Sequence, residues 1–472
     1  MKVFKSYKFK LLPTSEQTTV LQQHGGNLRY AWNKLVEFAN EQNGSLKKFP
    51  SKKELREQLK VIQKENDFLK ISHSQPLQST SDKLFDTIIK SLKPETIKKR
   101  KQKLAQTLNE PDEAKKKKQV AKALSFGFPK FKRKDMTNDS IFYPQGFKVK
   151  QSRIYFPKIG WIDYKKCRRL EGIVKFLTIV QDGDEWFVSI TTEVEIKDQE
   201  KKSLDQSNIV GIDVGLKMFA TLSDGTEIKN PRTLKKYLKR LRREQRVLSR
   251  RQLVETEEIK FGKKVKKSSN NRNKQILKAQ RTYKKVKNSR KDFLHKVSHQ
   301  IITKFDGVAL ETLDIQAMMK ANGKAMNRNI ADVSWFEFGK MLEYKCLWNH
   351  KHFVKIDQFE PSTQACNQCH SIQKLSLKDR VYVCPQCGNI CGRDMNASKN
   401  IRDKGIELLN SRSTLASKGI YACGVLPRRT LKQEKLGLRL SSNEGKCLES
   451  QASPSGGVVD FRINNLYNRI VK

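Results

Sequence analysis

The chain has 472 residues, enough for two to four domains with a substantial core. Its 96 Lys and Arg residues against 49 Asp and Glu give a formal net charge of +47, which favours a polyanionic partner, nucleic acid ahead of a membrane surface. No apolar signal segment opens the sequence and no apolar run reaches eighteen residues, so we expect no membrane partner and a cytoplasmic location.

The first 200 residues show strand, helix and strand patterns in turn. Residues 3–12 alternate apolar and polar positions and predict a strand, and Thr14 with Gln17 predicts a capping box for the helix that follows. From about 45 to 125 the spacing of apolar residues predicts a small helical domain. From about 140 to 195, short alternating segments predict a compact barrel-like β-domain with a hairpin turn at 182–184.

The rest of the chain predicts a second α+β region. Residues 208–230 predict three short strands, and 305–313 and 352–359 predict two more. Between them, residues 232–296 carry 25 Lys or Arg against 5 Asp or Glu, and their pattern predicts two helices joined by a basic loop. Beyond 410 the sequence is basic and rich in Ser and Gly, which predicts a partly disordered tail.

Five of the nine cysteines lie within 26 residues, which is the clustering of a metal site. Two Cys-x-x-Cys pairs with fourteen residues between them have the spacing of a four-cysteine zinc ribbon. The predicted ligands of this one structural Zn²⁺ are Cys366, Cys369, Cys384 and Cys387. Four thiolates saturate zinc, so the nearby His370 and Cys391 are left out. A redox dithiol and a chance pattern are the alternatives.

Three carboxylates stand out: two lie in apolar strand sequences, where a buried acid is costly unless a cation neutralises it, and one lies at the start of a helix. Asp213 lies in the strand sequence GIDVG, Glu311 ends the strand sequence ALETL, and Asp394 begins a helix, where it is otherwise only an N-cap. Acidic side chains from two strands and a helix, converging on a sheet, can hold two Mg²⁺ ions about 4 Å apart. The arrangement matches the active site of RNase H-like nucleases.

The basic helices at 232–296 are predicted to contact phosphate groups. An imbalance of 25 to 5 is too large for ion pairs along the helices to neutralise, although a solvated charged face is the alternative. The candidate residues are Arg242, Arg243, Arg272 and Lys274.

Several motifs taken together resemble the TnpB family, the transposon-encoded RNA-guided nucleases related to type V CRISPR effectors. The resemblance covers roughly residues 1–435. The motifs that carry it are GIDVGLKMFATLSDG, NNRNK with RKDFLHK, VALETL, the CNQC and CPQC pairs and RDMNASKNI, with YKFKLLPTSEQ, LRYAWNKLVE, GFPKFKRK, FPKIGW and ACGVLPRRTLKQE as further matches.

The resemblance implies a multidomain α+β fold. A wedge-like β-barrel is interrupted by a helical recognition domain, and a RuvC-type domain of RNase H-like α/β fold carries a zinc ribbon. The implied boundaries are 1–30 for the N-terminal wedge segment, 31–125 for the recognition domain, 126–200 for the wedge barrel, 205–362 for the RuvC-like domain with its basic helical hairpin, 363–390 for the zinc-binding domain, 391–410 for the end of the RuvC-like domain and 411–472 for the tail.

The resemblance also implies the function. Asp213, Glu311 and Asp394 become a RuvC triad that binds Mg²⁺ in a DNA endonuclease. A guide RNA from the transposon end and double-stranded target DNA are the implied partners, with one protein copy expected on one RNA. A short target-adjacent DNA motif is implied as well, and Gln75, Gln78 and Ser79 are candidate readers, unless they only form a capped polar helix start.

Two other functions stay open at this point. One is a nuclease-inactive, RNA-guided repressor, and the other is a nuclease or transposase that acts without RNA. The closeness of Cys387 to Asp394 in the sequence also predicts a mechanical role for the zinc module, which would brace the segment that carries the last carboxylate.

Overall fold

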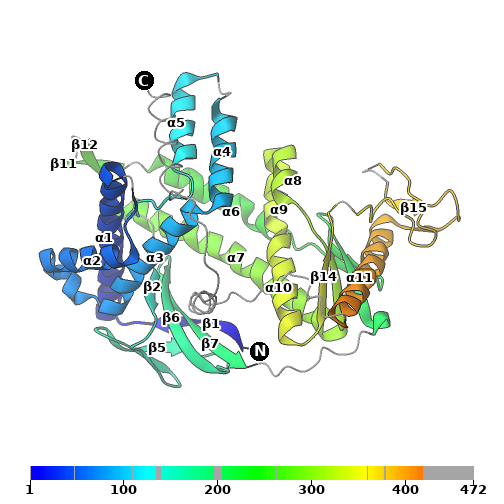
Figure 1. Cartoon of the computed structure of the whole chain (residues 1–472), viewed down its shortest axis with the longest axis horizontal. Coiled ribbons are helices and arrows are strands. Elements are labelled where there is room, and N and C mark those ends of the chain that lie inside the picture. The colour runs from blue at the N-terminus through cyan, green and yellow to red at the C-terminus, as the bar shows by residue number, and fades with distance from the viewer. Residues whose placement is uncertain are drawn as a thin grey trace, which may run out of the picture. The chain divides into compact units, whose positions relative to one another are not determined.

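The structure is a computed structural model that describes residues 2–46, 48–108, 111–133, 140–195, 205–251, 253–260, 263–358, 360–376 and 379–417. These residues fall into two compact units, the first up to residue 195 and the second from residue 205 (Figure 1). Each unit combines helices with a sheet, so the predicted multidomain α+β class is confirmed. Within the described ranges, no helix is both long and apolar enough to cross a bilayer.

The first unit is built on a seven-stranded sheet with the order β2-β6-β7-β1-β5-β4-β3. Its strands are β1 (Lys2–Leu12), β2 (Ser140–Tyr143), β3 (Lys148–Val149), β4 (Arg153–Phe156), β5 (Gly160–Lys165), β6 (Ile173–Asp182) and β7 (Glu185–Glu195). The predicted hairpin turn is confirmed, since Asp182 pairs with Glu185. The strand order ends at β2 and β3, so the described strands form an open sheet, and closure into a barrel stays a prediction.

Helices α1 (Ser15–Leu46), α2 (Lys52–Glu65) and α3 (Ser74–Leu92) share one core with this sheet, and α4 (Pro94–Leu108) and α5 (Glu113–Leu124) pack against each other next to α3. A short 3-10 helix lies at Asp67–Ile71. The predicted capping box is confirmed: the Thr14 backbone N–H donates to Gln17 Oε1 at 3.1 Å, and the Gln17 N–H donates to Thr14 Oγ1 at 3.2 Å. Buried side chains of the helices, such as Leu84, belong to the same cluster as Phe9 of β1. Helix α1 runs through residue 30, the predicted domain boundary.

The second unit contains a five-stranded mixed sheet with the order β10-β9-β8-β13-β14. Its strands are β8 (Ile209–Val214), β9 (Met218–Leu222), β10 (Glu227–Lys229), β13 (Gly307–Glu311) and β14 (His352–Ile356). Strands β8, β9 and β10 run antiparallel, whereas β8, β13 and β14 run parallel. All five predicted strands are therefore present, and the direction of the sheet changes at β8.

Helices cover both faces of this sheet. Ile212 and Leu310 pack in one cluster with side chains of α7 (Asn270–Lys304) and α10 (Trp335–Trp348). Ile209 and Ala309 pack on the other face with Ile401 of α11 (Arg393–Ser417). Alternate residues of a strand point to opposite faces. Asp213 and Glu311 therefore end their strands on the face that α11 covers.

Helix α11 lies unusually close to strand β8 because a glycine faces it. A Cβ atom added to Gly211 would lie 2.0 Å from the Ser398 carbonyl oxygen and 2.4 Å from the Arg402 backbone nitrogen. A second glycine, Gly405 of α11, faces Ala309, where an added Cβ would lie 2.4 Å from the Ala309 Cβ. The two glycines let the helix and the sheet approach closely, at Gly211 two residues before Asp213 and at Ala309 two residues before Glu311.

We expect Gly211→Ala to destabilise the second unit by about 3 kcal/mol, because the methyl group meets backbone atoms that cannot move aside as a side chain can. Thermal unfolding measures the loss. Gly44→Ala is the control, since an added Cβ there meets nothing within 4 Å in helix α1, and it should stabilise the protein slightly. Equal stability of the Gly211→Ala protein and the wild type would contradict the tight contact.

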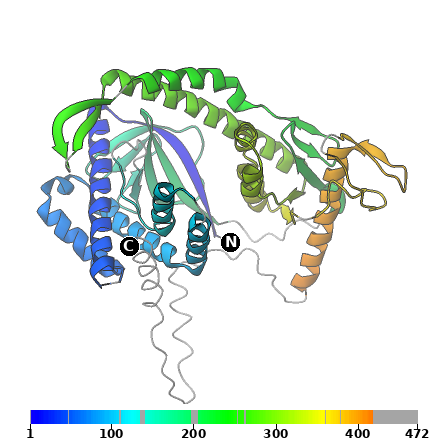
Figure 2. The same cartoon turned by 90° about the horizontal axis from the view of Figure 1, so that it is seen from above.

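The basic region at 232–296 differs from its prediction in one part. Helix α6 (Thr233–Arg250) and α7 run side by side, as Figure 2 shows and as predicted. Their connection was predicted as a loop, and this is wrong: β11 (Leu253–Lys260) and β12 (Lys263–Ser268) form an antiparallel hairpin. The β-branched residues Val254, Thr256 and Ile259 favour strands despite the lysines around them. Two shorter helices, α8 (Ile315–Ala321) and α9 (Lys324–Val333), follow β13.

The last elements of the second unit are the strands β15 (Val381–Val383) and β16 (Ile390–Gly392), which pair as a small antiparallel hairpin. Helix α11 starts directly after β16 and continues to Ser417, past the predicted domain end at 410. The predicted disorder of the tail beyond that point concerns residues 418–472, which lie outside the described residues.

Candidate functional site

The three predicted carboxylates lie together at the carboxyl ends of the inner strands β8 and β13 of the five-stranded sheet. Asp213 lies near the end of β8 and Glu311 ends β13, and the register that pairs Ile212 with Leu310 brings both to the same level. Asp394 lies in the first turn of α11, which packs on these strands. The carboxyl ends of parallel strands, at the point where a sheet changes direction, are a common place for ligand sites in α/β proteins.

Burial and mutual repulsion act on these carboxyl groups. Burial, and then the negative charges of Asp394 and Glu311, raise the pKa of Asp213 to about 8. Burial also raises the pKa of Glu311 to about 6. Near pH 7 the Asp213 carboxyl therefore keeps its proton unless a cation compensates the charge. Strongly raised pKa values in a cluster of acids are typical of functional sites.

Arg393 is a neighbour of the cluster that the sequence patterns did not single out. Its guanidinium lies 3.1 Å from Asp394 Oδ1, its side chain is only 14% exposed, and its positive charge lowers the pKa of Asp213. The Arg393 backbone N–H donates to the Arg380 carbonyl in the loop before β15. This backbone hydrogen bond fixes Arg393, whose guanidinium in turn orients the Asp394 carboxylate.

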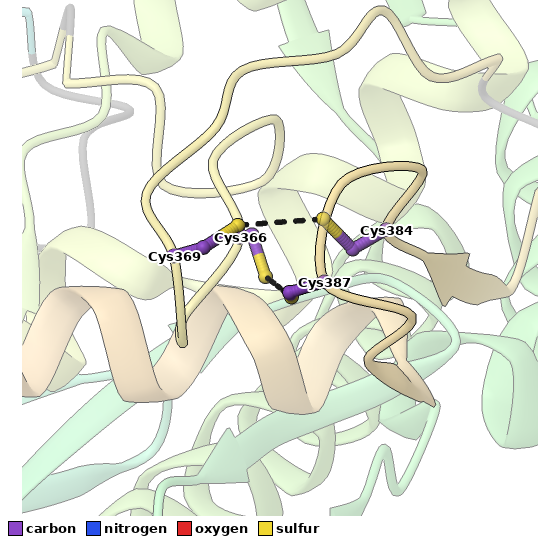
Figure 3. Close-up of side chains that lie close together, drawn as sticks. All are labelled: Cys366, Cys369, Cys384 and Cys387. Carbon is purple, nitrogen blue, oxygen red and sulfur yellow. Dashed lines mark hydrogen bonds between the residues drawn. The ribbon is translucent and has the colours of Figure 1, made fainter.

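The four predicted cysteines form a second, separate cluster (Figure 3). The sulfur atoms of Cys366 and Cys387 lie 3.6 Å apart, and those of Cys369 and Cys384 lie 3.5 Å apart. Four sulfurs in a tetrahedron at about 2.3 Å from a Zn²⁺ ion are separated by about 3.8 Å. The cluster is therefore nearly arranged to hold a metal such as zinc.

In the described part of the chain, these cysteines are the only group of at least three His, Cys, Asp or Glu residues whose ligand atoms all lie within 4.8 Å of one another. The two clusters differ in donor chemistry, because thiolates suit zinc whereas carboxylates suit magnesium.

The two Cys-x-x-Cys turns have the same pattern of backbone hydrogen bonds, each within its own turn. The N–H of Cys366 donates to the carbonyl five residues later, and the N–H of His370 donates to the Cys366 carbonyl; Cys384 and Gly388 repeat both contacts. His370 has φ +60° and Gly388 has φ +70°, so both close their turns in the left-handed region. His370 is exposed and serves the turn, in agreement with its exclusion as a ligand.

Polar neighbours favour the thiolate of Cys384, one of the four cysteines. Ser371 Oγ lies 3.2 Å from the sulfur atoms of both Cys369 and Cys384. The pKa of Cys384 falls to about 6, first because of this hydroxyl and then because of the Cys387 backbone N–H. Metal binding needs deprotonated thiols, so these contacts prepare Cys384 as a ligand.

The cysteine module has a very small hydrophobic core of its own. Its buried members are Cys366, Cys384 and Tyr382, whose hydroxyl donates to the Gln364 carbonyl at 3.1 Å. A module of this size seldom folds on apolar burial alone and usually needs a metal or a disulfide. A metal held by the four cysteines would therefore stabilise this module.

Two asparagines fasten the cysteine module to helix α11. Asn396 is fully buried; its Oδ1 accepts the Asn367 N–H at 3.0 Å, and its Nδ2 donates to the Ala365 carbonyl at 2.6 Å. Asn400, one turn later, donates to the carbonyls of Ser362 and Ala365, each at 2.7 Å. The first cysteine turn is therefore tied to the helix turn that carries Asp394. Sequence reasoning missed both residues, although their i,i+4 spacing placed them on one helix face.

We expect Asn396→Ala to loosen this attachment while the four cysteines keep their metal. It leaves the Asn367 N–H and the Ala365 carbonyl without their buried partner, a loss of roughly 2–3 kcal/mol. Hydrogen exchange at the Asn367 amide measures the loosening. Glu407→Ala on the same helix is the control, since the Glu407 side chain is 65% exposed. Unchanged protection of the Asn367 amide would contradict the attachment.

The predicted phosphate-contact residues divide into two groups. Arg242 and Arg243 of α6 and Lys274 of α7 are exposed. Arg272, by contrast, donates hydrogen bonds from its guanidinium to the carbonyls of Leu248, at 3.0 Å, and Arg251. It thereby caps the end of α6. The structure therefore gives Arg272 a role in joining the two helices.

The predicted motif readers lie in the first turns of α3. Gln78 is exposed, and Gln75 and Ser79 are half-buried. Gln78 lines a cavity of about 590 Å³ whose other walls are mainly cationic side chains of α2, among them Lys52, Arg56 and Lys60. Part of that charge is balanced, because Arg56 lies 2.8 Å from Asp82.

Three family models match the chain. A model described as "Probable transposase" (OrfB_IS605) matches residues 189–322, and a "Cas12f1-like, TNB domain" model matches residues 335–401, which include the cysteine module and the start of α11. A "Helix-turn-helix domain" model (HTH_OrfB_IS605) matches residues 1–44, which form β1 and most of α1 in the structure.

Individual relatives extend the match over nearly the whole chain. The chain is 30% identical over 457 residues to "Putative RNA-guided DNA endonuclease InsQ" of Escherichia coli (strain K12), covering 92% of this chain and 98% of that protein. It is 25% identical over 258 residues to "TnpB-like protein L770" of Acanthamoeba polyphaga mimivirus, covering 53% of this chain and 46% of that protein. Among solved structures, CasPhi-2 (Cas12j) bound to crRNA shares 11% identity at a TM-score of 0.39, covering 86% of this chain and 98% of that chain.

Proposed function

Because the chain belongs to the TnpB family, we propose that it is an RNA-guided DNA endonuclease that cuts double-stranded DNA next to a short target-adjacent motif. The name of its Escherichia coli relative, which the chain matches over 98% of that protein's length, supports the activity. The net charge of +47 suits a protein that holds an RNA and a DNA together.

The observation that carries the proposal is the meeting of Asp213, Glu311 and Asp394 at one sheet edge, where their charges and burial raise the pKa of Asp213 to about 8. Numbering the sheet from β8 gives the strand order 3-2-1-4-5, with the first three strands antiparallel and the last two parallel to the first. This order supports a RuvC-type domain of RNase H-like fold around the carboxylates.

The carboxylates fit a pair of Mg²⁺ ions. They offer only hard oxygen ligands, and the repulsion between them needs a cation. When bound, the ions supply an activated water molecule and stabilise the leaving 3′ oxygen in hydrolysis of the phosphodiester. Asp213, Glu311 and Asp394 hold the ions, and Arg393 keeps the Asp394 carboxylate oriented.

The cysteine module holds one structural Zn²⁺ through Cys366, Cys369, Cys384 and Cys387. Four thiolates leave no open coordination position, so this ion takes no part in the cutting. Through Asn396 and Asn400 the module braces the turn of α11 that presents Asp394. The zinc site therefore contributes to catalysis only by positioning.

The remaining assignments concern nucleic acid. Arg242, Arg243 and Lys274 contact phosphates of the guide RNA, which is transcribed from the transposon end, or of its hybrid with DNA. Gln75, Gln78 and Ser79 read the target-adjacent motif from the recognition helices, and the cationic cavity beside Gln78 supports their contact with DNA. The first unit then corresponds to the wedge and recognition domains, with one protein copy on one RNA.

The test begins with protein purified from cells that carry its native locus. Sequencing of the bound RNA identifies the guide, and a matching target beside a randomised flank then reveals the motif from the DNA that is cut in Mg²⁺. We expect cutting that depends on the RNA. Cutting without RNA would favour a self-sufficient nuclease or transposase, and RNA-dependent binding without cutting would favour the nuclease-inactive repressor.

A further inference from the structure

The second unit contains a cavity of about 180 Å³ next to α10, near the ends of the strands that carry Asp213 and Glu311. Its walls include Val214, Glu311, Trp335, Phe336, Gly339 and Lys355. Val214 directly follows Asp213, and Glu311 is itself one of the three carboxylates. The cavity therefore lies at the ends of the same strands as the carboxylates, on the face of the sheet that α10 covers.

The size and the walls of this cavity suit one flat ring system. A volume of 180 Å³ is below the roughly 300–1,000 Å³ of pockets for drug-sized ligands, so a longer molecule does not fit inside. Trp335 and Phe338 in its lining are 6% and 0% exposed, and their packing fixes the start of α10. Gly339 adds no side chain that would fill the space.

Phe336 differs from its aromatic neighbours because it is 66% exposed. Lys340 Nζ lies 5.3 Å from the centre of its ring, and Lys355 contributes to the cavity wall. An exposed aromatic ring with ammonium groups beside it is complementary to a nucleotide, whose base stacks on rings and whose phosphates attract cations.

We propose that this cavity, the base cavity, receives the nucleobase next to the phosphate that is cut, stacked on Phe336. The inference rests on the proposed nuclease function, since it places the cut phosphate at Asp213, Glu311 and Asp394. A base inside the cavity cannot pair with a complementary strand.

Cutting by the RNA-loaded protein tests the base cavity. Abasic nucleotides are placed one position at a time on both sides of the mapped cut in guide-matched DNA. In the wild type, the abasic nucleotide at one adjacent position should slow cutting about tenfold, because stacking is lost. Phe336→Ala should slow cutting of intact DNA by a similar factor and lose its sensitivity to that abasic position, whereas Phe336→Tyr should behave like the wild type.

Leu347→Ala is the matched control, because Leu347 is an exposed apolar residue of the same helix, 45% exposed, and is not part of the cavity wall. It should leave rate and abasic sensitivity unchanged. The base cavity alone would be overturned if no abasic position slowed cutting by the wild type, or if the abasic nucleotide slowed Phe336→Ala as much as it slows the wild type. A wild type that cuts no guide-matched DNA in Mg²⁺ would overturn the proposed function and the base cavity with it.

Discussion

Replacement of Asp213 by Asn is expected to abolish DNA cutting and, at the same time, to stabilise the Mg²⁺-free protein. The pKa of Asp213 is about 8 in the folded chain and 3.8 as its ordinary value. In the unfolded chain the carboxyl loses its proton above about pH 4, whereas the folded chain retains it up to about pH 8. The wild type therefore loses stability as the pH rises through this window, and Mg²⁺ restores it.

An amide at position 213 has no proton to lose, so the Asp213→Asn protein should lack most of this pH dependence. At pH 8 and without Mg²⁺ it should be more stable by roughly 2–4 kcal/mol, a figure reduced from the full shift because Asp213 is only half-buried. Cutting should fall by about 10³-fold or more, since a metal ligand is lost. Thermal unfolding of zinc-loaded protein between pH 5 and pH 8, with and without Mg²⁺, gives the first result, and a cleavage assay gives the second.

Asp224→Asn is the matched control for this substitution. Asp224 lies in the turn between β9 and β10 of the same sheet, and its carboxylate forms an ion pair with Lys304. Its replacement should leave cutting unchanged and should not raise stability. The account of the carboxylate cluster would be wrong if Asp213→Asn lowered the stability of the Mg²⁺-free protein as much as Asp224→Asn, or if it still cut DNA.

Replacement of Cys384 by Ser should remove zinc, unfold the cysteine module and stop cutting while the guide RNA stays bound. The buried core of the module is limited to Cys366, Cys384 and Tyr382, so its folding free energy comes mainly from the metal, for which about 10–16 kcal/mol is typical. Without a folded module, Asn396 and Asn400 lose their partners and the first turn of α11 is no longer held. Zinc content, limited proteolysis of residues 361–392, RNA binding and cleavage measure these four effects.

Cys391→Ser is the matched control, because Cys391 lies in β16 beside the cluster but outside the four ligands. It should retain zinc and cutting. Loss of zinc in Cys391→Ser, or full cutting by a zinc-free Cys384→Ser protein, would show that the ligand set or the bracing role is wrongly assigned.

The features that the sequence predicted well are those in which the local pattern determines the structure. The capping box of Thr14 and Gln17 and the hairpin turn before Glu185 depend on neighbours in the chain. The strands around Asp213 and Glu311 were also found, because a carboxylate beside apolar strand residues is unusual enough to be noticed. The cysteine spacing is equally local, since each Cys-x-x-Cys turn sets its own geometry.

The missed features depend on contacts between distant parts of the chain. Gly211 has the ordinary appearance of a strand glycine, and only the position of α11 shows why a side chain is not tolerated there. Asn396 acts through Asn367 and Ala365, which precede it by 29 and 31 residues. Phe336 follows the buried Trp335, and no periodicity marks it as exposed beside the carboxylates. Arg272 donates to the Leu248 carbonyl, 24 residues earlier, which no local pattern shows, and its contact with phosphate stays a prediction.

The central claim is that Asp213, Glu311 and Asp394 bind Mg²⁺ and cut DNA that a guide RNA selects. One measurement tests it most directly: the RNA-loaded protein is mixed in Mg²⁺ with two plasmids that differ only in the guide-matched segment, and the fraction cut is compared. We predict that only the matched plasmid is cut, and that withholding Mg²⁺ stops the reaction. Equal cutting of both plasmids, or cutting of the matched plasmid without a divalent ion, would contradict the account.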